Sequence, residues 1–293
     1  MKKILISLIF VFFLSSCIQI KTNYNKELKE LGYIDIASIN KENIPYIIEY
    51  NLPYDDYIKF SVIPGFDIKK IGTYLEVYKT TPITYNHQLV VNMVNMPDFM
   101  TKNYTFGKEA INQDNELILV NKNFYISRDF VPTKLITVPS EYVILTERVV
   151  HIKDIVLDHF IDLYNDAKKN NYTFFIYSGY RDFKYQESLY EKNNDELTTA
   201  KAGHSEHQTG YTIDISTKEL GLTSYLGESN AGKWLKNNAY KYGFIIRYPE
   251  SKEDLTGFSY EPWHIRYVGL EHAKKIYEEN LILEEYLLKY FTY

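Results

Sequence analysis

The pattern that most constrains the fold lies between Leu117 and the C-terminus, where short apolar runs alternate with helical stretches. A helix is indicated by apolar residues that recur at intervals of three or four positions, namely Val156, Phe160, Leu163 and Ala167. This part of the chain has no regular strand–helix–strand rhythm, which a parallel sheet would require. The pattern therefore predicts an α+β fold in which helices flank a small antiparallel sheet.

The other elements of this part are expected from apolar runs, alternation and terminating glycines. The segment 210–215 alternates, so that Thr212 and Asp214 would lie on one face of a strand and apolar side chains on the other. Gly243 is a residue type favoured at the C-terminal end of a helix. The expected elements are strands at 173–177, 210–215, 244–248 and 264–268, and helices at 156–168, 182–193, 233–242 and 270–289.

The N-terminal third has a different character. Prolines interrupt its short elements, and it contains no cluster of catalytic residue types. The polar run 112–115 is typical of a boundary between domains. We therefore expect a smaller accessory domain or spacer at 17–115 and a larger domain at 116–293.

The first residues have the character of an export signal. Lys2 and Lys3 precede an apolar run of about eleven residues, which is shorter than the roughly 20 needed to span a bilayer as a helix. Leu14-Ser15-Ser16-Cys17 resembles the lipobox of bacterial lipoproteins, and an ordinary signal peptide is the alternative. The resemblance implies a lipoprotein signal peptide at 1–16 and lipidation of Cys17, the only cysteine. The protein would then lie outside the cytoplasmic membrane, held by a lipid anchor.

The charge balance excludes one class of partner. The formal net charge is −5, whereas nucleic-acid-binding proteins usually carry a basic stripe. We expect no nucleic-acid partner.

Two histidines and an aspartate have the character of a catalytic zinc site. His207 and Asp214 lie seven residues apart with Gly210 between them, and His264 begins a later expected strand. Catalytic zinc sites use three His or carboxylate ligands and leave a fourth position open. Nitrogen and oxygen ligands suit Zn²⁺, although affinity alone would admit other divalent metals. His204 is a weaker candidate, as a group beside the cluster.

Further residue types near this cluster match the needs of a peptidase. Glu261 precedes His264 by three residues and could act as a general base. Arg181 offers the planar, bidentate grip that a free carboxylate requires. Gln186 and Ser205 could form hydrogen bonds with a substrate.

At these residues the sequence resembles the VanY-type zinc D-alanyl-D-alanine carboxypeptidases. The resemblance rests on SGYR, QESLY, GHSEHQTGYTIDIS, WLKNNAYKYGFIIRYP and TGFSYEPWHIRYVG, in the family's order, and it runs from about residue 117 to the C-terminus. It implies a fold of the Hedgehog/DD-peptidase type, Zn²⁺ on His207, Asp214 and His264, Glu261 as the catalytic base, and Arg181, Gln186 and Ser205 on the substrate. Ala202 and Tyr211 depart from the usual pattern, and neither is a ligand.

The implied reaction removes the terminal D-alanine from peptidoglycan stem peptides. Two alternatives stay open at this point. The first is cleavage of the L,D bond of the stem tetrapeptide, since related enzymes share the same metal ligands. The second is an inactive wall-binding module that has kept zinc.

Overall fold

The computed structural model describes residues 24–80, 86–100, 102–104, 107–111, 113–145 and 149–291. The expected signal peptide and the lipidation site at Cys17 lie outside these residues. Contacts divide the chain into two compact units, Met1–Met96 and Pro97–Tyr293. Among the described residues, no helix is long and apolar enough to cross a membrane.

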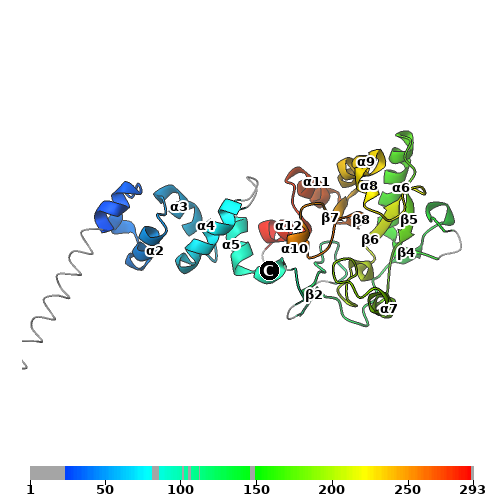
Figure 1. The fold of residues 1–293 in the computed structure, drawn as a ribbon, viewed down its shortest axis with the longest axis horizontal. Coiled ribbons are helices and arrows are strands. Elements are labelled where there is room, and N and C mark those ends of the chain that lie inside the picture. The colour runs from blue at the N-terminus through cyan, green and yellow to red at the C-terminus, as the bar shows by residue number, and fades with distance from the viewer. Residues whose placement is uncertain are drawn as a thin grey trace, which may run out of the picture. The chain divides into compact units, whose positions relative to one another are not determined.

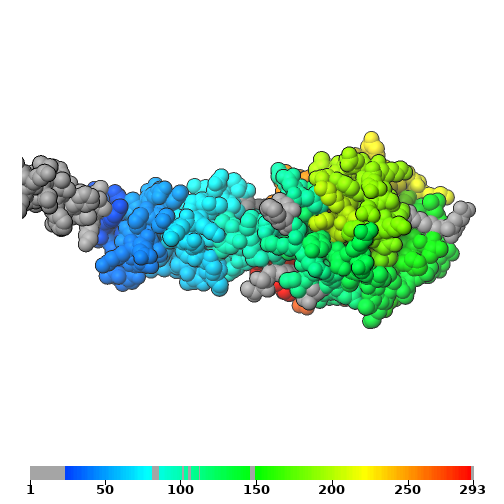
Figure 2. Space-filling view, turned by 90° about the horizontal axis from the view of Figure 1, so that it is seen from below, coloured from blue at the N-terminus to red at the C-terminus, as the bar shows by residue number. Residues whose placement is uncertain are grey.

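The N-terminal unit is helical where it is described (Figure 1). Residues 24–30 form a helix. The following elements are η1 (Ile36–Ser38), η2 (Lys41–Asn43), α2 (Ile44–Glu49), α3 (Tyr54–Ser61), η3 (Ile68–Lys70), α4 (Ile71–Thr80) and α5 (His87–Asn95). One apolar core joins them, with Leu28, Ile47, Phe60 and Tyr74 at its centre. The blue and cyan atoms of this unit pack into one body in the space-filling view (Figure 2).

The C-terminal unit is built on a four-stranded antiparallel sheet, as the sequence predicts. The strands are β5 (Phe175–Ser178), β6 (Thr212–Ser216), β7 (Phe244–Tyr248) and β8 (Glu261–Tyr267), in the spatial order β5-β6-β8-β7. Two smaller sheets pair β1 (Lys108–Glu109) with β2 (Phe124–Tyr125) and β3 (Leu135–Thr137) with β4 (His151–Lys153). The α+β fold class is confirmed.

Several helices pack on one face of the four-stranded sheet, and polar side chains of the candidate site lie on the opposite face. The helical elements of this unit are η4 (Pro97–Phe99), η5 (Ser140–Tyr142), α6 (Asp154–Lys169), α7 (Phe183–Asn193), η6 (Glu206–Thr209), α8 (Tyr225–Glu228), α9 (Asn230–Asn238), η7 (Ala239–Tyr242), α10 (Glu253–Thr256), α11 (Leu270–Glu278) and α12 (Leu283–Tyr290). Phe160 and Leu163 of α6 share one core with Ile213 and Ile215 of β6. Burying one such side chain contributes about 1.5–3 kcal/mol. Because side chains alternate along a strand, Thr212 and Asp214 lie on the opposite face.

The boundary between the units lies earlier than the expected division at residues 115 and 116. Residues 97–115 belong by their contacts to the C-terminal unit. The amides of Asn121 and Asn123 donate to the backbone carbonyls of Phe99 and Asp98, at 3.0 and 2.9 Å, and β1 pairs with β2. The two side-chain hydrogen bonds join residues more than 20 positions apart, so local sequence patterns do not reveal them.

The expected final helix at 270–289 is in fact two helices. The chain leaves α11 after Glu278, and Asn280 adopts a left-handed conformation with φ of 52°. Helix α12 begins at Leu283, where the Glu285 carboxylate accepts a hydrogen bond from the backbone N–H of Ile282 at 2.8 Å. That bond satisfies a backbone donor that the first turn of a helix leaves free. The apolar pattern continues through the break, which explains why it predicted one helix.

Candidate metal centre and active site

Strand pairing places Asp214 and His264 side by side. Asp214 on β6 is the direct partner of His264 on β8, and directly opposed residues of an antiparallel pair project to the same face. His264 Nδ1 lies 3.2 Å from Asp214 Oδ1. Two residues that are 50 positions apart in the sequence therefore meet through the register of the sheet.

A short turn brings His207 to the same place. His207 lies in η6, which ends at Gly210 in the left-handed conformation, with φ of 73°, and the chain then enters β6. His207 Nδ1 lies 2.6 Å from the carbonyl oxygen of Gly179. Since a carbonyl only accepts, Nδ1 carries the proton, and the lone pair is on Nε2, which lies 3.2 Å from Asp214 Oδ2.

Gly179 is needed for this arrangement. A Cβ atom at this position would lie 2.5 Å from the carbonyl oxygen of His151, closer than real contacts allow. The glycine of the SGYR segment thus lets the backbone approach closely enough for its carbonyl to orient His207.

The three side chains fit a metal ion. Their ligand atoms all lie within 4.8 Å of one another, and all three residues are buried. Among the described residues, His207 Nε2 and Asp214 Oδ1 have no hydrogen-bond partner. Unsatisfied buried nitrogen and oxygen atoms are costly unless a ligand such as a metal ion engages them. Two imidazoles and one carboxylate form a donor set that suits Zn²⁺.

The protonation states of His207 and Asp214 agree with metal binding, whereas burial at His264 is outweighed by three nearby carboxylates, which raise its pKa, so that a metal ion would have to displace a proton there. Burial, together with the nearby Arg181 guanidinium, lowers the pKa of His207 to about 4, so its imidazole is neutral at pH 7. Burial acts to raise the pKa of Asp214, but His207 and His264 outweigh it and hold that pKa well below the ordinary value. A neutral histidine and an ionised carboxylate are the forms that bind metals.

Glu261 reaches the cluster through an irregularity in the sheet. Strand β8 begins at Glu261, not at His264 as expected, and the register shifts so that Ile246 and Tyr248 of β7 pair with Ile265 and Glu261. Between these two pairs, one residue on β7 lies opposite three on β8, and such bulges redirect side chains. Glu261 Oε2 consequently lies 3.3 Å from His264 Nδ1, although residues three apart on a regular strand would face opposite sides.

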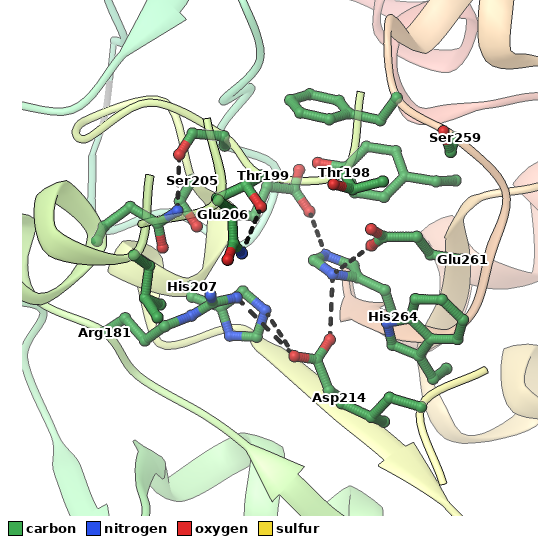
Figure 3. Close-up of a pocket in the computed structure, with 18 of the residues that line it drawn as sticks. Arg181, Thr198, Thr199, Ser205, Glu206, His207, Asp214, Ser259, Glu261 and His264 are labelled. Carbon is green, nitrogen blue, oxygen red and sulfur yellow. Dashed lines mark hydrogen bonds and ion pairs between the residues drawn. The ribbon is translucent and has the colours of Figure 1, made fainter. Parts of the chain in front are cut away.

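All seven residues proposed from the sequence line one cavity of about 410 Å³: Arg181, Gln186, Ser205, His207, Asp214, Glu261 and His264. Figure 3 shows the carboxylates of Asp214 and Glu261 directed at His264, with Arg181 beside His207. An Nη2 atom of Arg181 lies 3.8 Å from Asp214 Oδ2. Gln186 Nε2 donates to the carbonyl of Ala200 at 2.7 Å, which ties it to the cavity wall.

Beside these seven residues the wall includes the buried Glu206, and its other lining side chains are uncharged. Its apolar side chains include Leu189, Leu222, Phe258 and Trp263, and its hydroxyl groups include Thr198, Thr199 and Ser259. The charged groups of the lining are therefore confined to the end of the cavity that holds the metal ligands. A cavity of this size and character suits a small peptide end with an uncharged side chain.

Comparisons with known proteins point to one family of enzymes. A family model described as VanY, D-alanyl-D-alanine carboxypeptidase, matches residues 150–270. The putative carboxypeptidase YodJ of Bacillus subtilis (strain 168) is 39% identical over 195 residues, which are 62% of this chain and 71% of that protein. The chain belongs to the VanY family. This membership confirms the resemblance found in the sequence and the expected class, a metallo-carboxypeptidase.

Two further comparisons differ in the bond that the name of the similar protein indicates. A D-alanyl-D-alanine carboxypeptidase of Enterococcus faecium is 39% identical over 194 residues, which are 64% of this chain and 62% of that protein. The solved structure of the LdcB LD-carboxypeptidase matches with a TM-score of 0.59 and 36% identity, covering 66% of this chain and 95% of that chain.

Sequence reasoning missed three buried charged residues behind the metal cluster. Glu206, Arg247 and Arg266 are completely buried or nearly so. The available signal was an arginine beside isoleucine in each of two expected strands, FIIRY and HIRY. Arginine is almost never fully buried unless it is paired, so each position predicts a buried partner. His204, the weaker candidate, lies with Nδ1 2.8 Å from the carbonyl of Asn121 and does not line the cavity.

Proposed function

We propose that this VanY-family protein is a zinc-dependent D-alanyl-D-alanine carboxypeptidase that removes the terminal D-alanine from peptidoglycan stem peptides. The observation that carries the proposal is the meeting of His207, Asp214 and His264 with the Glu261 carboxylate in one cavity. The description of the matching family and the name of the E. faecium relative support the D,D bond.

The proposed mechanism assigns a separate task to each residue. His207 Nε2, the Asp214 carboxylate and His264 would hold Zn²⁺, which supplies Lewis-acid polarisation and makes hydroxide accessible near neutral pH. Glu261 takes a proton from the attacking water as its oxygen bonds to the peptide carbonyl carbon. When the C–N bond breaks, Glu261 returns that proton to the departing amine. Burial raises the pKa of Glu261, which brings it closer to the pH at which it must accept and donate a proton.

Arg181 is proposed to bind the free carboxylate at the end of the peptide. We expect Arg181→Ala to raise KM for peptides with a free C-terminus, because a charge-assisted hydrogen bond contributes about 1.5–3 kcal/mol, or roughly 10- to 100-fold. Steady-state kinetics on a free peptide and on its C-terminally amidated form measure the effect. If the wild type cleaves both forms equally well, Arg181 does not have this role.

The L,D reaction on the stem tetrapeptide is the second candidate, and the similarity to the LdcB structure favours it. Incubating the full chain and Zn²⁺ with pentapeptide and tetrapeptide muropeptides, followed by mass analysis, separates the two reactions. We expect the pentapeptide to lose one alanine. Preferential shortening of the tetrapeptide would support the L,D reaction, and the absence of any shortening would support an inactive module.

We further propose that the protein acts outside the cytoplasmic membrane and that a lipid on Cys17 anchors it there. The substrate lies in the cell wall, and the residues before Cys17 have the pattern of a lipobox. Cys17→Ser is expected to move the protein from the membrane fraction to the soluble fraction of fractionated cells, because lipid chains supply the anchoring energy. Unchanged partitioning would contradict the anchor.

A further inference from the structure

A buried carboxylate lies directly behind the metal cluster. Glu206 precedes the ligand His207 and is 1% exposed. Its Oε1 atom accepts from Arg247 Nε at 2.7 Å and lies 2.9 Å from Arg266 Nη1. Its other oxygen, Oε2, faces His264 Nε2 at 3.8 Å. One carboxylate thus joins two arginines to a candidate metal ligand.

The His264 ring presents its two nitrogens to different groups. Nδ1 faces Asp214 and Glu261, where the metal would lie, whereas Nε2 faces Glu206. Neither His264 Nε2 nor Glu206 Oε2 has a hydrogen-bond partner among the described residues, and both atoms are buried. A proton on Nε2 would match the acceptor on Glu206 and leave the Nδ1 lone pair for the metal. A shift of less than 1 Å brings the two atoms within hydrogen-bond distance.

We propose that Glu206 is a positioning residue that holds the Nε2–H of His264 and thereby directs its Nδ1 lone pair at the metal. Carboxylates in this position fix the tautomer and the ring orientation of metal-binding histidines. The inference rests on the proposed zinc site and adds to it a residue that acts through His264.

The position of Glu206 is itself fixed by a network that reaches the C-terminal helix. Arg247 donates through Nη1 and Nη2 to both carboxylate oxygens of Glu284 on α12, at 2.9 and 2.7 Å. Arg266 Nη2 donates to the carbonyls of Glu116 and Ile118, at 2.8 and 2.9 Å. The two glutamates and two arginines balance in charge, as buried ionic groups require. The orientation of His264 therefore depends on contacts far from the motif in which Glu206 lies.

The network provides a matched control. Glu284 shares Arg247 with Glu206 and is equally buried, but Glu206 lies between it and His264. Replacing either glutamate by glutamine leaves the arginines with uncompensated charge and lowers stability. Of the two changes, only the one at Glu206 removes the carboxylate that faces His264 Nε2.

The test compares wild type, Glu206→Gln, Glu206→Asp and Glu284→Gln as full-length chains. Zinc affinity is measured by competition with a chromogenic chelator, and Co²⁺ spectra report the ligand field. Near-UV circular dichroism reports folding. We expect Glu206→Gln to weaken zinc binding by roughly 10- to 100-fold and to change the Co²⁺ spectrum. Glu284→Gln should lower the melting temperature and keep the wild-type zinc affinity.

The Glu206→Asp variant tests the positioning role if Glu206→Gln does not fold. It retains the charge that Arg247 and Arg266 need but withdraws the carboxylate from His264, so zinc affinity should fall while the fold persists. Wild-type affinity in the folded Glu206 variants would overturn the inference, as would an equal loss in Glu284→Gln. Failure of the wild type to bind zinc would instead refute the proposed metal site.

Discussion

Replacing Glu261 by alanine is expected to lower kcat by roughly 10²- to 10⁴-fold while zinc binding persists. Glu261 is the carboxylate in the cavity that lies 3.3 Å from His264 without belonging to the group of three mutually close ligands. Its removal takes away the proton acceptor for the attacking water and leaves His207, Asp214 and His264 intact. Turnover of a pentapeptide muropeptide and zinc content, measured on the same preparation, test both parts of the expectation.

Two further variants sharpen this experiment. Glu261→Gln keeps the size of the side chain but cannot accept the proton, so it should lose as much activity as the alanine variant. Glu253→Ala removes an exposed carboxylate on α10 and should leave turnover unchanged. Loss of zinc from the Glu261 variants would show that this residue is a ligand, and undiminished turnover would place the general base elsewhere.

Replacing His207 by alanine is expected to weaken zinc binding by roughly 10²- to 10³-fold and to abolish turnover at ordinary zinc concentrations. Apparent binding free energies of zinc in four-ligand structural sites are about 10–16 kcal/mol, so one ligand accounts for several kcal/mol. The His207 imidazole also has a partner on each side, because its Nδ1 atom contacts the carbonyl oxygen of Gly179 and its Nε2 atom faces Asp214. Chelator competition measures the affinity.

His204 provides the matched control for this experiment. It lies three residues earlier in the same motif, but it contacts Asn121 and the ring of Tyr104 and does not line the cavity. His204→Ala should lower stability through lost packing and keep the zinc affinity of the wild type. If His204→Ala loses zinc and His207→Ala retains it, the ligand assignment is wrong.

The sequence predicted well those features that depend on short segments. Helices α6 and α7 follow from apolar spacing and from Asp182, whose carboxylate accepts the N–H of Tyr185 at 2.7 Å to begin α7. Alternation in β6 placed Thr212 and Asp214 together on one face, and β6 lies where the sequence expected a strand. These signals are local because backbone periodicity and capping act over a few residues.

Features that depend on distant contacts were predicted less well. The unit boundary follows from side-chain bonds across more than 20 residues, and the break between α11 and α12 depends on one left-handed asparagine. The buried group of Glu206, Arg247, Arg266 and Glu284 joins residues from 206 to 284. Each arginine could be recognised in its strand, but no local pattern identifies its partner.

The candidate zinc site shows this division most clearly. The sequence by itself predicted which side chains would form the candidate site, because two imidazoles, two carboxylates and a guanidinium in specific motifs leave few other chemistries. The tertiary structure alone decided how they meet. The antiparallel register sets Asp214 opposite His264, the shift in β8 turns Glu261 to the same face, and Glu206 lies behind the His264 ring. These positions result from strand pairing and buried charge balance across the whole unit, which no short stretch of sequence specifies.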